Sequence, residues 1–261
     1  MNVRGRQLLP SVGLRAMLRL RAGGVTLTSQ AFQRIPGVEV RPCFAKVRIT
    51  APDPVTSWGI VRQIAGGEYE HAGLTPRHGD RVIDIGANVG IFSLWAQWRG
   101  ATVVAYEPSP AAFSFLVSNT RGRPVEPVHG AVVGELPNGR RETRLYLHGE
   151  RSTRNTLLPI EIVTGAALTQ SVVVPAYRLC DVLVDGCELM KIDTEGSEYE
   201  MLAHTPADVL RRAERVVIEF HRMAGDPEDL LSVLRNSGFD ASVLEEQDGI
   251  GAAGIIGAIR R

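Results

Sequence analysis

The chain has few cysteines, no excess charge of either sign and no long apolar run. Its 261 residues include only Cys43, Cys180 and Cys187, too few and too scattered for a disulfide framework or a CxxC metal site. We interpret them as buried or half-buried thiols of a protein in a reducing compartment. The formal net charge of +0 argues against a protein devoted to duplex nucleic acid, although it leaves room for a local basic patch.

Membrane-spanning and secretory signals are also missing from the sequence. No apolar stretch approaches the roughly 18–20 residues that a membrane span needs. The N-terminal segment "MNVRGRQLLPSVGLRAMLRLRAGG" has no uninterrupted apolar region and no clear cleavage site, so we do not interpret it as a signal peptide. We therefore expect a cytoplasmic enzyme with a small-molecule substrate. A homo-oligomer is compatible with the sequence, which does not fix the number of copies.

The chain divides into an N-terminal extension, residues 1–65, and a main domain, residues 66–261. Leucine, methionine and arginine recur at roughly helical spacing over residues 11–21, which predicts a short basic amphipathic helix. This helix could pack on the domain or act as a lid, and contact with a membrane surface is the less favoured alternative.

Within the main domain, strand and helix signals alternate, which indicates an α/β sheet with helices on both faces. A different pattern interrupts them at residues 140–178, where two strand-like segments flank a polar loop and form a substrate-side insert. The C-terminal segments can form an antiparallel pair. The predicted strands are 81–86, 101–107, 125–133, 187–193 and 213–220, and the predicted helices are 90–98, 109–120, 197–205 and 226–238.

The motif "VIDIGANVG" (82–90) joins a buried strand to a helix through a glycine loop. Glycines there allow a ligand to approach the backbone closely near the helix N-terminus. A dinucleotide fingerprint needs a second glycine where this chain has Asn88. Asp84, two residues before Gly86, disfavours a pyrophosphate and suits a cationic group. Its carboxylate could contact that group directly, or it could hold the loop in place.

An acid at the end of the second predicted strand narrows the class of ligand that the site could bind. Glu107 lies 21 residues beyond Gly86, where a carboxylate can bind both hydroxyls of a ribose. Together, the loop and this acid favour a nucleoside that carries positive charge and no phosphate, as S-adenosylmethionine (SAM) does. The alternatives are an ordinary strand-to-helix turn without a ligand and a nicotinamide enzyme.

Four segments in order resemble the FkbM-type methyltransferases of the class I SAM-dependent superfamily: "VIDIGANVGIFSLWA", "VVAYEPSPAAFSFL", "LMKIDTEGSEYEML" and "VVIEFH". The resemblance covers roughly residues 68–222. It implies a class I (Rossmann-like) methyltransferase fold, a seven-stranded, mostly parallel sheet with an antiparallel last strand. It also implies SAM as the methyl donor and usually a hydroxyl acceptor. Known members modify natural products, sugars and glycolipids.

The resemblance assigns cofactor roles by position. The residues matched to the cofactor loop, the ribose acid with its neighbours and the adenine side are Asp84, Gly86, Ala87, Asn88, Gly90, Glu107, Pro108, Ser109 and Ala131. Glu70 could close over the methionine end of the cofactor, with a surface turn as an equal alternative. Asp193 is expected to line the same crevice.

The chemistry is expected where the fourth and fifth parallel strands end, because such ends converge on the cofactor crevice. The candidate catalytic residues are His221, Asp193, Glu195 and Glu219. We predict His221 as the general base, since its unperturbed pKa lies near neutrality. Alternatively, Asp193 and Glu219 could bind Mg²⁺, which would orient the acceptor and lower its pKa. Glu198 and Glu200 are expected on the solvated face of the following helix.

The insert supplies candidate substrate contacts in Arg151, Ser152 and Asn155, with an ordinary mobile loop as the alternative. The function that we predict is a SAM-dependent O-methyltransferase acting on a secondary metabolite or sugar. The rivals are N-methylation of a small-molecule amine and a non-catalytic binding module with a SAM fold. A nucleic-acid methyltransferase is disfavoured, because "DTEG" is not an (N/D)PP(Y/F) signature.

Overall fold

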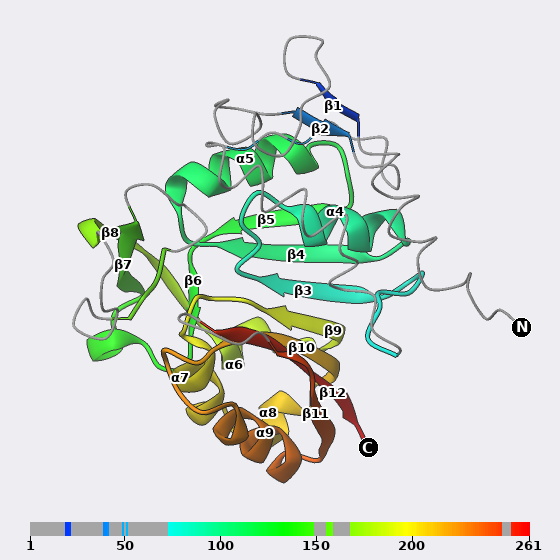
Figure 1. Ribbon diagram of the computed structural model, residues 1–261, viewed down its shortest axis with the longest axis vertical. Helices are drawn as coiled ribbons and strands as arrows, with labels where there is room; N and C mark the ends of the chain where they lie inside the picture. Colours follow the sequence, from blue (N-terminus) through cyan, green and yellow to red (C-terminus); the bar gives the residue numbers. More distant parts are fainter. Residues whose placement is uncertain are drawn as a thin grey trace, which may run out of the picture.

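The structure is a computed structural model that describes residues 19–21, 39–41, 49, 51, 73–148, 155–158, 168–246 and 252–261 (Figure 1). Two short strands, β1 (Arg19–Arg21) and β2 (Glu39–Arg41), form an antiparallel pair. The helix predicted over residues 11–21 is therefore wrong at its last three residues, because these pair with β2. Residues 11–18 lie outside the described residues, and the domain boundary near residue 65 stays a prediction.

Seven strands form the main sheet in the order β11-β12-β10-β9-β3-β4-β5. The neighbours from β10 to β5 are parallel, whereas β12 is antiparallel to both β10 and β11, which confirms the mostly parallel sheet with an antiparallel last strand. Its strands are β3 (Arg81–Ile85), β4 (Thr102–Glu107), β5 (Val125–His129), β9 (Cys187–Ile192), β10 (Ala213–His221), β11 (Phe239–Glu246) and β12 (Ala253–Arg260).

Helices cover both faces of this sheet because successive side chains of a strand point to opposite faces. Val82 belongs to an apolar cluster with Phe92 of α4, whereas the adjacent Ile83 belongs to a cluster with Met201 of α7 and Leu230 of α9. The helices are α4 (Ile91–Trp98), α5 (Pro110–Thr120), α6 (Leu179–Val182), α7 (Glu198–Ala203), α8 (Ala207–Leu210) and α9 (Pro227–Asn236), and a 3-10 turn spans Pro137–Gly139.

A second, three-stranded sheet has the order β6-β8-β7 and lies beyond the carboxyl ends of the parallel strands (Figure 1). It consists of β6 (Ala131–Val133), β7 (Glu142–His148) and β8 (Leu168–Arg178). The single strand predicted over residues 125–133 is therefore wrong. The chain turns at Gly130, and the residues after it pair with β8 instead of continuing beside β4.

The predicted start of α5 is confirmed in detail. The Ser109 side chain accepts a hydrogen bond from the Ala112 amide, and Pro110 occupies the first helical position, where its missing N–H is not needed. Ser109 lies two residues after Glu107, the end of β4. Among the described residues, no helix is long and apolar enough to cross a membrane.

Candidate active site

The loop between β3 and α4 packs directly against the end of β9. Gly86 has a φ of 78°, and a Cβ added there would lie 1.7 Å from the Asp193 carbonyl oxygen. Only glycine suits both the left-handed backbone and this close approach. The cofactor loop and the first residue of the acidic segment after β9 are therefore fixed against each other.

Glu107, the last residue of β4, is held beside this loop by two backbone amides. Its Oε2 accepts a hydrogen bond from the Asn88 N–H and its Oε1 accepts one from the Ser109 N–H, each at 2.8 Å. Burial raises the pKa of Glu107 to about 7, although these two hydrogen bonds oppose the shift. A carboxylate has about four lone-pair sites, so Glu107 can still accept hydrogen bonds from a ligand.

Asp84 is fully buried and is already paired within the fold. Its Oδ2 accepts a hydrogen bond from the Ser93 hydroxyl at 2.6 Å, and its Oδ1 lies 3.4 Å from the Lys191 Nζ. Lys191 also lies 3.3 Å from the Asp193 Oδ2 and donates a hydrogen bond to the Gly86 carbonyl at 2.9 Å. Of the two predicted roles for Asp84, the geometry favours holding the loop over direct contact with a cationic ligand.

The remaining cofactor candidates differ in what they expose. The Ala87 side chain belongs to an apolar cluster with Phe92, and the Ala131 side chain belongs to one with Leu145. The Asn88 Oδ1 is buried without a hydrogen-bond partner among the described residues. An unpaired buried oxygen is costly, so a ligand that donates a hydrogen bond to it would stabilise the loop.

The last three cofactor candidates are Gly90, Pro108 and Glu70. Gly90, with a φ of 92°, is the N-cap of α4. The Pro108 carbonyl lies 3.1 Å from the His129 Nε2. Glu70 lies outside the described residues.

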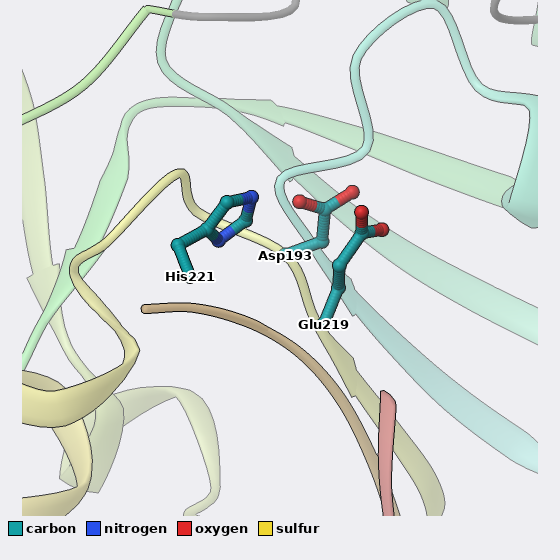
Figure 2. A group of neighbouring side chains, drawn as sticks. All are labelled: Asp193, Glu219 and His221. Carbon is teal, nitrogen blue, oxygen red and sulfur yellow. The ribbon is translucent and has the colours of Figure 1, made fainter. Parts of the chain in front are cut away.

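Asp193, Glu219 and His221 converge at the ends of β9 and β10, as Figure 2 shows. One potential ligand atom from each residue lies within 4.8 Å of those from the other two. The charge of Asp193, together with burial, raises the pKa of Glu219 above its ordinary value. We refer to Asp193 and Glu219 as the carboxylate pair. Two such groups at close range favour sharing a proton.

The carboxylates around the buried His221 favour its protonated form. Its Nδ1 lies 3.2 Å from the Glu198 Oε1 and its Nε2 lies 3.4 Å from the Glu195 Oε2. Burial alone would lower the pKa of His221, but Glu198, Glu195 and Asp193 more than offset it and raise the pKa to about 10. The raised pKa contradicts the premise of a near-neutral imidazole, while the general-base role of His221 stays a prediction.

Glu198 is the main residue that sequence reasoning missed. It was expected on a solvated face, yet its side chain is completely buried. The Glu198 Oε1 accepts hydrogen bonds from the Thr194 N–H at 2.9 Å and the Gly196 N–H at 3.2 Å, in addition to facing His221. A signal was present in the sequence, because Met201 and Leu202 follow at helical spacing and place Glu198 on the apolar face of α7.

Glu200 is about half exposed, as expected for a surface position. It also has a structural role, because its carboxylate accepts hydrogen bonds from the amides of Gly134 and Glu135. Glu200 therefore ties α7 to the segment after β6.

Residues 155–158 are the described part of the polar loop of the insert, and they contact the acidic segment after β9. The Thr156 hydroxyl donates a hydrogen bond to the Glu195 carbonyl at 2.7 Å. The Asn155 Oδ1 accepts a hydrogen bond from the His148 amide at 2.9 Å, so this oxygen stabilises the insert itself. The other two predicted substrate contacts, Arg151 and Ser152, lie outside the described residues.

Comparisons with known proteins place the chain among methyltransferases. The family model described as the methyltransferase FkbM domain matches residues 84–241. The 31-O-demethyl-FK506 methyltransferase FkbM of Streptomyces tacrolimicus is 32% identical over 213 residues, which is 69% of this chain and 79% of that protein. Methyltransferase 1 of Beauveria bassiana is 26% identical over 185 residues, 62% of this chain and 73% of that protein. The solved structure of methyltransferase FkbM from Methylobacillus flagellatus aligns with a TM-score of 0.45 and 13% identity, over 78% of this chain and 54% of that chain.

Proposed function

Because the chain belongs to the FkbM family of methyltransferases, which use SAM, we propose that it transfers the methyl group to a hydroxyl of a small molecule. The carboxylate pair is the single observation that carries the choice of a hydroxyl. An alcohol must lose a proton as its oxygen is methylated, and Asp193 and Glu219 form a group suited to accept it. The name of the Streptomyces relative, which refers to an O-demethyl compound, supports the same choice.

The residues of the cofactor loop are suited to SAM. Glu107 has lone pairs left for ribose hydroxyls, and the buried Asn88 Oδ1 needs a donor. The acidic surroundings of the crevice suit a cation. When bound, SAM supplies a methyl group that its sulfonium has already activated, so the protein needs only to align the acceptor, exclude water and remove a proton.

The chain's own residues then divide the work. Asp193 and Glu219 receive the acceptor proton, and the pKa of Glu219 is raised to about 8, close to the neutral pH at which a base works best. His221, protonated and held by Glu198, keeps Glu195 in place instead of accepting the proton. Lys191 holds Asp193 and the Gly86 carbonyl together, which fixes the carboxylate pair relative to the cofactor loop.

A second arrangement uses the same residues to bind Mg²⁺. Asp193 and Glu219 offer carboxylate oxygens, the ligands that Mg²⁺ prefers, within 4.8 Å of each other. Such an ion would lower the pKa of the acceptor hydroxyl. Loss of turnover in EDTA that MgCl₂ restores would favour this arrangement, whereas turnover unchanged by EDTA would exclude it.

Methyl transfer from tritiated SAM to a panel of matched alcohols and amines tests the proposal. We expect transfer to alcohols, with losses of at least about a hundredfold in Asp193→Asn and Glu219→Gln. The control variants are Asp240→Asn and Glu228→Gln, whose parent side chains are 82% and 72% exposed. Transfer to amines alone would support the N-methyltransferase alternative. SAM binding without transfer to any compound would support a non-catalytic binding module.

A further inference from the structure

The acid loop, residues 193–197, contains a backbone conformation that needs support. Glu195 has a φ of 53°, in the left-handed region. The other non-glycine residues with positive φ in the described parts of the chain are both asparagines, which tolerate this region more easily. A glutamate held there is strained, and such strain persists only where neighbouring groups enforce it.

One set of neighbouring contacts comes from α7. Glu198 accepts hydrogen bonds from the amides of Thr194 and Gly196, which lie on either side of Glu195. These two bonds fix the backbone path of the loop from the protein interior. They leave the Glu195 carbonyl to be held from the opposite side.

The opposite side is the substrate-side insert. Thr156 is 2% exposed, and its hydroxyl donates to the Glu195 carbonyl at 2.7 Å. Thr156 is itself fixed, because its backbone N–H and carbonyl both pair with Tyr146 of β7, at 3.1 and 2.9 Å. The insert therefore brings a rigidly placed donor to the one strained glutamate of the acid loop.

Leu158 makes a second contact between the insert and the acid loop. A Cβ added at Gly196, whose φ is 110°, would lie 2.4 Å from the Leu158 Cδ1. The leucine thus packs directly on the glycine backbone, next to Glu195. Thr156 and Leu158 of the insert thus contact two consecutive residues of the acid loop, Glu195 and Gly196.

We propose that Thr156 is a positioning residue that holds Glu195 in its left-handed conformation and so makes the substrate-side insert part of the active site. Glu195 reaches His221 from this conformation, and His221 lies beside the carboxylate pair. The inference rests on the proposed function, since the acid loop matters to turnover only if chemistry occurs at these strand ends. Thr156 acts through Glu195 and need not touch the methyl acceptor.

Thr156→Val and Thr156→Ser separate the hydroxyl from the methyl group of this side chain. Valine keeps the shape but loses the hydroxyl, which donates to the Glu195 carbonyl and accepts from the Leu158 N–H, whereas serine keeps both hydrogen bonds. We expect Thr156→Val to increase amide hydrogen exchange in residues 194–197 by about tenfold and to lower the kcat of methyl transfer by a similar factor, with the Kd for SAM changed less than about twofold. Thr156→Ser should restore most of both properties.

Thr120→Val is the matched control, because Thr120 is equally buried and donates a 2.7 Å hydrogen bond to the Leu116 carbonyl within α5. It should leave exchange in the acid loop and turnover near the wild-type values. Unchanged exchange in Thr156→Val, or a Thr156→Ser variant as impaired as the valine variant, would overturn the inference. Hydrogen exchange requires no methyl acceptor. A protein that methylates nothing would therefore refute the proposed function, while the exchange measurement would still decide whether Thr156 holds the acid loop.

Discussion

Replacing Lys191 by methionine tests the charge arrangement beneath the cofactor loop. The Lys191 side chain is only 4% exposed and lies within 3.4 Å of Asp84 and 3.3 Å of Asp193. Methionine preserves much of the apolar volume but leaves Asp84, which is 0% exposed, without its cation. Removing one partner of a buried ion pair costs about 3–5 kcal/mol, a large share of the roughly 5–15 kcal/mol that stabilises a domain.

The measurement is urea unfolding followed by circular dichroism at pH 7. The two aspartates raise the pKa of Lys191 above its ordinary value, although burial opposes them. A raised lysine pKa gives stability that is fully present below the unfolded pKa of about 10.5 and is lost as the pH rises through the folded value. At pH 7 the whole contribution is therefore measured.

The double variant Lys191→Met, Asp84→Asn provides the internal control. Asparagine can still accept the hydrogen bond from Ser93, so the double variant lacks the orphaned charge and should recover about 1–3 kcal/mol relative to Lys191→Met alone. A Lys191→Met protein that loses less than about 1 kcal/mol, or a double variant that recovers nothing, would refute the reasoning about this pair.

Three further outcomes follow from the site. Glu107→Ala should weaken SAM binding roughly tenfold to a hundredfold in calorimetry, whereas Ala at the exposed Glu126 of the neighbouring strand should not. Glu198→Gln should lower the pKa of His221 in an NMR titration and reduce turnover by about tenfold or more; an unchanged titration would show that Glu198 does not hold the charge on His221. The raised pKa of His221 gives stability that is fully present below pH 6.5 and is lost as the pH rises to about 10. The free energy of unfolding, measured in EDTA, should therefore decline across this range by up to about 1.4 kcal/mol per pH unit. In His221→Asn this decline should be smaller.

The order and type of most elements in the main sheet could be predicted because each depends on local pattern. The runs that became β3 and β9 are mainly apolar and β-branched or long-chain residues around single charged positions, and the start of α5 carries its own capping residue in Ser109. The break between β5 and β6 was missed because it depends on which strand is the partner. β6 pairs with β8, some forty residues away in sequence, and no local pattern encodes that contact.

The positions of the site residues could be predicted better than their charges. Asp193, Glu219 and His221 were expected at strand ends that converge, and they do converge. The protonation of His221 was mispredicted because it depends on Glu198, whose burial follows from the packing of α7 on the sheet. Thr156 gave no sequence signal at all, since its partner is a backbone carbonyl that any residue at position 195 would supply.

The distribution of buried charge narrows the choice of the group that receives the acceptor proton. Lys191 is paired with Asp84 and also contacts Asp193, and His221 is placed between Glu195 and Glu198. Each cation is therefore already shared between two acids, and neither can neutralise the carboxylate pair completely. Glu219 is left with the charge of Asp193 beside it, which is the condition that raises its pKa. A proton or another cation on Asp193 would compete with its ion pair to Lys191, so Glu219 is the better placed member of the carboxylate pair to bind one. His221 would first have to lose the proton that two carboxylates hold in place.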